Sequence, residues 1–131
     1  MGTHSSTKVQ TTDGIVVNMY RHYDGYYEGH GAELANFLNG IRLVNGIPFG
    51  GENIKIANGM DDLAAQIVAH FKITENVGGF YLVGLDRDEE YNYTIYEDNG
   101  TIRMKCVYDG KVRFDGTPTE FLDWKDEYKV S

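Results

Sequence analysis

The sequence predicts one α+β domain over residues 1–131, with an antiparallel sheet of about six strands, two helices and a C-terminal β-meander. Two observations carry this prediction. After Gly78, apolar and polar residues alternate with a period of two, and the dipeptides Asn99-Gly100 and Asp109-Gly110 are typical of two-residue hairpin turns. Before that residue, two segments have the apolar spacing of amphipathic helices.

The expected strands are short apolar runs bounded by turn residues. They span residues 8–10, 15–20, 79–85, 91–96, 101–108 and 111–115. Asp13-Gly14 is a turn signal between the first two strands, which therefore form a hairpin. The last four strands follow one another without an intervening helix, so we expect them to pair as one continuous meander.

The two helices are expected at about residues 32–39 and from Asn58 or Gly59 to about Lys72. The second is the more regular, and its expected buried stripe consists of Leu63, Ile67, Val68 and Phe71. Residues 41–57 between the helices form a long connection, of the kind that is usually functional or interfacial. The tail is expected to hold one helical turn around Phe121 and Trp124.

Composition limits the function classes. A formal net charge of −8 disfavours broad binding to nucleic acid or to anionic membranes. No segment approaches the roughly 18 apolar residues of a membrane helix, and no apolar secretion signal stands at the N-terminus, so a cytoplasmic protein is expected. Cys106 is the only cysteine, which rules out an intramolecular disulfide and predicts a small core residue.

Alternation divides the last three strands into two faces. The expected core face consists of Tyr91, Tyr93, Ile95, Ile102, Met104, Cys106, Val112 and Phe114. The expected opposite face consists of Asn92, Thr94, Tyr96, Arg103, Lys105, Lys111, Arg113 and Asp115. Four of the chain's twelve basic residues thus gather on one face of one strand pair in an acidic protein.

This basic face predicts a site for an anionic ligand. Arginine matches phosphate oxygens in a bidentate manner and lysine adds a point charge, while an amide reads a base or ribose edge and an aromatic ring stacks on a base. The candidate ligand-binding residues on the strands are Phe80, Asn92, Arg103, Lys105, Arg113 and Asp115. The alternative is a solvated sheet face whose lysines and arginines only keep it soluble.

The polar loop over residues 21–31 is the second candidate region. Its His22, Asp24, Glu28 and His30 are residue types that bind metals or transfer protons, as a metal-assisted phosphoesterase would require. No established metal or catalytic motif is present, so loop-anchoring hydrogen bonds or ligand contacts are favoured. Arg21 and Tyr23 are therefore added to the candidate ligand-binding residues, and no catalytic residue, metal or cofactor is expected. A further alternative is an inhibitor that binds a host protein through this tyrosine-rich loop.

Three segments of the chain resemble a family of small phage and prophage proteins, the Thoeris anti-defence proteins of the first type. These segments are Met1-Gly2-Thr3 with Ser5, the run over residues 18–26, and Gly29-His30-Gly31. The resemblance covers nearly the whole chain. It implies a homo-oligomeric sponge in the host cytoplasm that binds cyclic ADP-ribose isomers made by TIR enzymes without degrading them. Some members of the family also hold cyclic trinucleotides at separate sites. The resemblance supplies no motif for the pocket, so the candidate residues rest on the two regions above.

Overall fold

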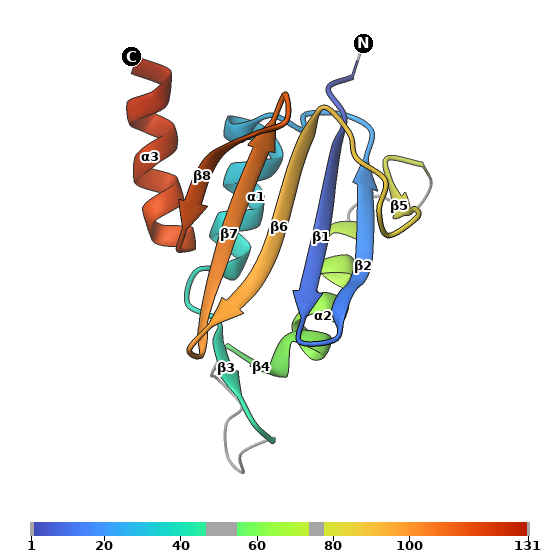
Figure 1. The fold of residues 1–131 in the computed structure, drawn as a ribbon, viewed down its shortest axis with the longest axis vertical. Helices are drawn as coiled ribbons and strands as arrows, with labels where there is room; N and C mark the ends of the chain where they lie inside the picture. The colour runs from blue at the N-terminus through green and yellow to red at the C-terminus, as the bar shows by residue number, and fades with distance from the viewer. Residues whose placement is uncertain (1, 47–54, 74–77, 131) are drawn as a thin grey trace.

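A six-stranded sheet forms the centre of the computed structural model, which describes residues 2–46, 55–73 and 78–130 (Figure 1). Its strands are β1 (Ser5–Thr11), β2 (Gly14–Arg21), β5 (Phe80–Leu82), β6 (Tyr91–Asp98), β7 (Thr101–Tyr108) and β8 (Lys111–Gly116). They lie in the order β5-β2-β1-β6-β7-β8. The predicted α+β domain with about six strands is confirmed. The sheet is mixed, however, because β1 and β6 run parallel while every other neighbouring pair is antiparallel.

The predicted hairpins form at the predicted turns. Asn99 and Gly100 both have positive φ, at 51° and 83°, as do Asp109 and Gly110, at 55° and 71°. Two successive residues with positive φ give the turn whose twist matches the strands beside it, so β6, β7 and β8 make a meander. The β1–β2 hairpin also forms at Asp13-Gly14, and both of its strands are longer than expected.

The expected continuous meander is wrong at its first strand. The predicted strand at 79–85 is reduced to β5, which pairs with β2 at one edge of the sheet. β1 occupies the place next to β6 that a meander would give to β5. This pairing of β1 with β6 joins residues about 86 positions apart, such as Ser6 and Asn92, so no local turn signal announces it.

The helices cover one face of the sheet (Figure 1). α1 (Ala32–Leu38) follows a π-helical turn, η1 (Tyr27–Gly31), and α2 (Gly59–Lys72) packs against β1 and β2. Between them lies a two-stranded parallel sheet of β3 (Arg42–Val44) and β4 (Ile56–Asn58). The predicted connection 41–57 therefore holds two short strands, and its residues 47–54, with Pro48 and Gly50-Gly51, lie outside the described residues.

A third helix, α3 (Pro118–Val130), replaces the single turn expected in the tail. The backbone N–H of Glu120 donates to Thr117 Oγ1 at 3.2 Å, and the Glu120 carboxylate accepts from the Thr117 N–H at 2.8 Å. These reciprocal bonds form a capping box, with Pro118 at the first helical position. Phe121 is fully buried and holds the helix against the body through ring contacts with Tyr27 and Phe114.

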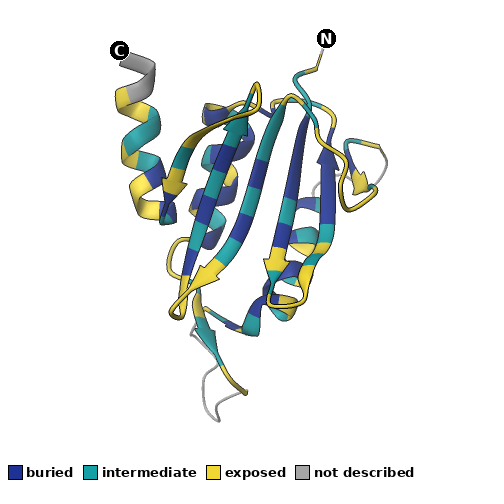
Figure 2. Cartoon of the chain, in the orientation of Figure 1, coloured by how far each residue is buried: buried dark blue, intermediate teal, exposed yellow. Residues whose placement is uncertain are grey.

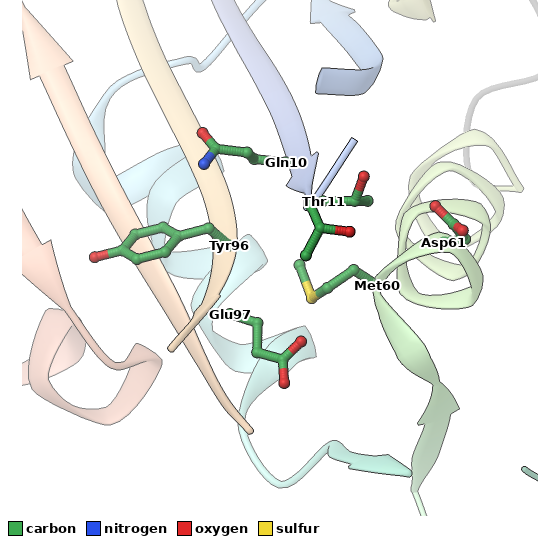
Figure 3. Close-up of a pocket in the computed structure, with 7 residues that line it drawn as sticks. Gln10, Thr11, Met60, Asp61, Tyr96 and Glu97 are labelled. Atoms are coloured by element: carbon green, nitrogen blue, oxygen red, sulfur yellow. The ribbon is translucent and has the colours of Figure 1, made fainter. Parts of the chain in front are cut away.

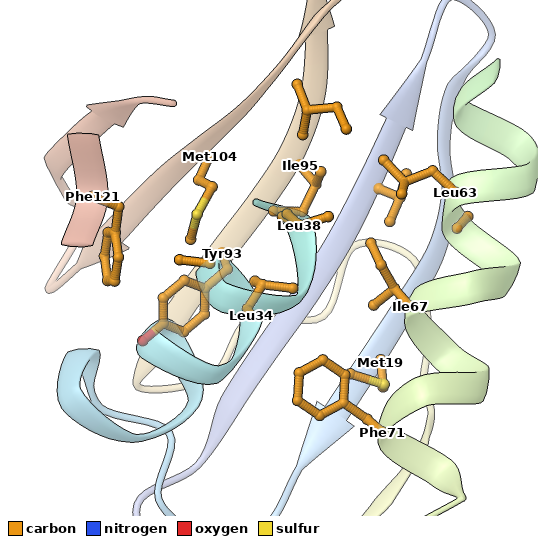
Figure 4. Packing of buried hydrophobic residues seen from close by; sticks show 14 of the residues in the cluster. Met19, Leu34, Leu38, Leu63, Ile67, Phe71, Tyr93, Ile95, Met104 and Phe121 are labelled. Carbon is orange, nitrogen blue, oxygen red and sulfur yellow. The ribbon is translucent and has the colours of Figure 1, made fainter. Parts of the chain in front are cut away.

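The core lies between the sheet and the helices (Figure 4). Its labelled members come from β2, α1, α2, β6, β7 and α3: Met19, Leu34, Leu38, Leu63, Ile67, Phe71, Tyr93, Ile95, Met104 and Phe121. The predicted stripe of α2 is confirmed, with Val68 only partly buried. Cys106 is buried as predicted, and burial raises the pKa of its thiol far above the usual range, which makes the thiol unreactive.

Residues 83–90, here called the strap, cross the outer face of β2 and β1 on their way from β5 to β6 (Figure 1). Asn18 projects from β2 toward the strap and donates from Nδ2 to the carbonyl oxygens of Gly84 at 2.7 Å and Arg87 at 2.9 Å. Asn18 is fully buried although it projects from β2 on the side away from the helices. The last four residues of β2 are all buried, and this half of the strand is coloured dark blue in Figure 2. The strap therefore covers one half of the outer face.

Asn18→Ala is expected to loosen the strap. It removes both hydrogen bonds to strap carbonyls, and such a loss from a buried site costs about 1–3 kcal/mol of the free energy of unfolding. Amide exchange of residues 83–88 is expected to accelerate more than that of β7. The control is Val16→Ala at an exposed position of the same strand, expected to stay within about 0.5 kcal/mol of the parent. Equal exchange in the strap of Asn18→Ala and of the parent would contradict this role.

Candidate functional site

The strap leaves the outer face of the sheet uncovered over β6, β7 and β8, and this surface is here called the open face. Lys8 of β1 borders it, because Lys8 is the cross-strand neighbour of Thr94. Thr94 is in turn opposite Lys105, and Lys105 is opposite Asp115. Since directly opposed residues project from the same face, these side chains form one row across four strands.

A second row lies two residues further along the strands, where Tyr96 is opposite Arg103. Arg103 donates from Nε to the Tyr96 hydroxyl at 3.1 Å and from a terminal nitrogen to the Asp115 carbonyl at 3.3 Å. The Tyr96 hydroxyl donates to the Asp115 carboxylate. Partial burial and then the bond to Asp115 raise the pKa of Tyr96, so this hydroxyl stays protonated and remains a donor. Arg103, Tyr96 and Asp115 are therefore held in one arrangement.

The charges of the open face are unevenly paired. Lys8 Nζ contacts Asp88 Oδ1 at 2.6 Å, and Arg103 Nε lies 3.7 Å from Asp115 Oδ1. The ammonium group of Lys105 has no hydrogen-bond or ion-pair partner among the residues that the structure describes, and its side chain is half-buried. The open face therefore carries a positive charge that is not neutralised, in a chain with a net charge of −8.

Asn92 also projects from the outer face, but its amide is occupied. It accepts hydrogen bonds from the Ser6 hydroxyl at 2.6 Å and from the Glu89 N–H at 2.8 Å, and it donates to the Glu89 carbonyl at 2.8 Å. These bonds fix the end of the strap to β6 and β1. The structure thus gives Asn92 an anchoring position beside the predicted ligand face.

Arg113 and Lys111 lie with Tyr108 and not on the open face, because Lys111 is opposite Tyr108 and Tyr108 is opposite Tyr91 of the core face. Cys106 is opposite Phe114 and Val107 is opposite Val112, so Arg113 is the extra residue of a β-bulge that changes the alternation of β8. The Arg113 guanidinium lies 5.6 Å from the centre of the Tyr108 ring and donates to the Tyr108 carbonyl at 3.2 Å. Val112, predicted in the core, is instead 58% exposed. The predicted grouping of Arg113 with Arg103 and Lys105 therefore does not form.

Arg21, Tyr23 and Phe80 lie on the helix side of the sheet. Arg21 is only 3% exposed, and its guanidinium carbon lies 4.8 Å from the centre of the Tyr23 ring and 5.0 Å from that of Phe80. It donates to Glu33 at 2.9 Å. Phe80 is buried in the core and not available for stacking on a ligand. These three predicted ligand-binding residues form a structural cluster apart from the open face.

His30 completes that cluster. Arg21 donates to His30 Nδ1 at 3.1 Å, which leaves the proton on Nε2, where it is donated to Thr7 Oγ1 at 2.6 Å. Complete burial, assisted by the Arg21 charge, lowers the pKa of His30 to about 3. His30 is therefore neutral at physiological pH, and it is fixed between strand β1 and strand β2.

The histidines of the 21–31 loop point to opposite faces of the sheet. His22 stacks on His4, with ring centres 4.7 Å apart, and its Nδ1 lies 2.7 Å from the hydroxyl of Tyr20 on the outer face. Across the described parts of the chain, no three histidine, cysteine, aspartate or glutamate residues are placed to hold a metal ion. His22 and His30 therefore do not meet at one site.

A cavity of about 320 Å³ adjoins the open face where β1 and β6 end (Figure 3). It is lined by Gln10, Thr11, Thr12, Met60, Asp61, Tyr96 and Glu97. Tyr96 thus belongs to the open face and to the cavity wall. Lys8 and Gln10 were not predicted as site residues, because only the parallel pairing of β1 with β6 brings them here.

Comparisons of the chain with protein-family models, curated proteins and solved structures found no match. None of the helices within the described ranges is long and apolar enough to cross a membrane.

The neutral His30 is expected to make the protein sensitive to acid. An unfolded histidine takes up a proton near pH 6.5 and folded His30 only near pH 3, so acidification between these values stabilises the unfolded chain. The free energy of unfolding should fall by about 1.4 kcal/mol per pH unit from this group alone. Denaturant unfolding at pH values from 6 to 4 gives the free energy of unfolding at each pH. Its decrease per pH unit should be smaller by about that amount in His30→Gln than in the parent.

A second measurement serves if His30→Gln folds poorly. In the NMR spectrum of the folded parent protein, the His30 ring should remain neutral from pH 7 down to about pH 4, because burial lowers its pKa to about 3. Protonation of folded His30 near pH 6.5 would contradict the buried, neutral assignment.

Proposed function

We propose that this protein binds and sequesters a small nucleotide on its open face without degrading it. The favoured ligand is a cyclic ADP-ribose isomer, as the resemblance to the Thoeris anti-defence proteins implies, with cyclic oligonucleotides as a further class. In this proposal the protein acts as a homo-oligomer in the host cytoplasm and removes an immune signal.

The observation that carries the proposal is the unpaired ammonium of Lys105 between two other cations. Lys8 lies in the same row and Arg103 in the next, on a surface that no helix of the described chain covers. The Thr94 hydroxyl lies between Lys8 and Lys105 and supplies a further donor. A phosphate oxygen placed over Thr94 would meet donors from three strands, and charge-assisted hydrogen bonds are the strong ones.

The existing ion pairs determine the order in which the cations of the open face would bind a ligand phosphate. Lys105 can bind an anion without losing a partner, whereas Lys8 must share or release Asp88 and Arg103 is held by Asp115. The Lys8–Asp88 pair joins an almost buried side chain, 15% exposed, to a carboxylate that is 71% exposed, so Asp88 can return to water at little cost. Exchange of Asp88 for a ligand phosphate is therefore the expected second step.

Sequestration needs affinity and no chemistry. A sponge lowers the free concentration of its ligand by occupying it, so it requires neither a nucleophile nor a general base. The separation of His22 from His30 by the sheet supports this proposal over a metal-assisted phosphoesterase. The second alternative is an inhibitor that binds a host protein, and a ligand titration distinguishes it from a nucleotide-binding protein.

Lys105→Ala is expected to weaken binding of a cyclic ADP-ribose isomer by about tenfold or more, because it removes one charge-assisted hydrogen bond. Isothermal titration calorimetry measures the loss, and the thermal shift on ligand addition should shrink in parallel. The matched controls are Lys111→Ala and Arg113→Ala, exposed cations of β8 that lie off the open face and should bind as the parent does.

The same experiment tests sequestration. Ligand released by denaturing the complex should be intact and stoichiometric with the protein. Linear or hydrolysed products would contradict the proposal in favour of an enzyme. Absence of any heat or thermal shift across a panel of cyclic nucleotides would favour a protein-interaction inhibitor, and a loss of binding in Arg113→Ala equal to that in Lys105→Ala would place the site elsewhere.

A further inference from the structure

The cavity at the ends of β1 and β6 is a consequence of the strand order. The two strands run parallel and pair from Ser5 with Tyr91 to Val9 with Ile95. Beyond this point the chain turns from β1 to β2 on one side and from β6 to β7 on the other. In open α/β sheets, neighbouring parallel strands whose connections leave in opposite directions have a crevice at their carboxyl ends, where ligands bind. The hairpin connections of β1 and β6 leave in opposite directions in the same way.

The strand residues of the cavity are those that the separation of β1 and β6 leaves without cross-strand partners between these two strands. Gln10 and Thr11 come from the end of β1, and Tyr96 and Glu97 from the end of β6. Met60 and Asp61 of α2 form the remaining wall (Figure 3). The cavity is thus a hollow between three elements of the chain, with one apolar side chain, Met60, and otherwise polar or aromatic lining.

The chemistry of this lining differs from that of the open face. The carboxylates of Glu97 and Asp61 receive no hydrogen bond from any residue described in the structure. Carboxylates repel phosphate but accept hydrogen bonds from hydroxyl groups, and an acidic side chain is the usual partner of ribose hydroxyls in nucleotide sites. The amide of Gln10 can donate and accept, which suits a sugar hydroxyl equally well.

The distance between the cationic row of the open face and the cavity is similar to the distance between a phosphate and its sugar in a nucleotide. Thr94 of the cationic row and Tyr96 at the cavity lie two residues apart on β6, which corresponds to roughly 7 Å along a strand. Tyr96 belongs to both, since it lines the cavity while its hydroxyl is bonded on the open face. Glu97 is opposite buried Ile102 and so projects toward the α2 side of the cavity. A phosphate over Thr94 would therefore leave its attached sugar at the mouth of the cavity.

We propose that the cavity is a ribose subsite, in which Glu97, with Asp61 and Gln10, accepts and donates hydrogen bonds to the 2′- and 3′-hydroxyls of a nucleotide whose phosphates lie on the open face. This inference rests on the proposed function, since it assumes that phosphate occupies the face. It adds a basis for selecting ribonucleotides over phosphate alone.

The test compares three probes by calorimetry: ADP, 2′,3′-dideoxy-ADP and pyrophosphate. The parent protein is expected to bind ADP about tenfold more tightly than the dideoxy analogue, the value of one charge-assisted hydrogen bond. Glu97→Ala should abolish this preference and leave pyrophosphate binding unchanged. Asp98→Ala is the matched control, because Asp98 is the next carboxylate of β6 and does not line the cavity. Lys105→Ala should weaken all three probes.

Each possible failure has its own meaning. Equal affinity of the parent for ADP and dideoxy-ADP, with pyrophosphate still bound, overturns the ribose subsite and leaves the proposed function standing. A preference that persists in Glu97→Ala also overturns it. A preference that disappears when divalent cations are chelated shows that the carboxylates hold a metal and overturns it in favour of a cation site. Failure of all three probes and of cyclic nucleotides to bind overturns the proposed function, and the subsite with it.

Discussion

The parallel pairing of β1 with β6 determines most of this structure. It inserts the N-terminal hairpin next to the C-terminal meander and so completes the sheet. It also separates β5 from β6, which forces residues 83–90 across the outer face of β2 and β1, where Asn18 holds them. The same pairing places Lys8 beside Thr94 and opens the cavity where the two strands part. The covered half of the outer face, the open face and the cavity all follow from this one contact.

The sheet divides polar groups into two sets with different roles. On the helix side, Arg21 and His30 are buried, bonded to one another and enclosed by aromatic rings. Buried polar groups of this kind specify the packing, because each would be costly to leave unpaired. On the outer side, Lys105 and the Lys8–Asp88 pair reach solvent and can exchange partners. Ligand binding is therefore expected on the outer side, where charged groups can exchange partners. The buried groups on the helix side are expected to contribute to stability.

Periodicity and turn chemistry predicted much of the fold: the α+β class, the hairpins, the second helix and the core face of β6 and β7. The helix at the tail begins with a capping box in Thr117-Pro118-Thr119-Glu120, and this local signal predicts a helix longer than the single turn expected there. The site was less predictable. A single bulge at Arg113 reversed the alternation of β8, and the Arg21 side chain proved to be buried. Lys8 joined the face through a pairing across more than half the chain, which no local pattern encodes.

The proposed binding site for an anionic nucleotide is the outer face around Lys105. The most direct measurement is an NMR titration of the isotope-labelled protein with a cyclic ADP-ribose isomer, followed through backbone amide shifts. Shifts are expected to concentrate on four residues of the outer face: Lys8, Thr94, Arg103 and Lys105. Residues of α2 beyond its first turn and the Arg21–His30 cluster are expected to remain unchanged. Shifts centred on the helix side of the sheet, or saturable binding that leaves the outer strands unperturbed, would contradict it.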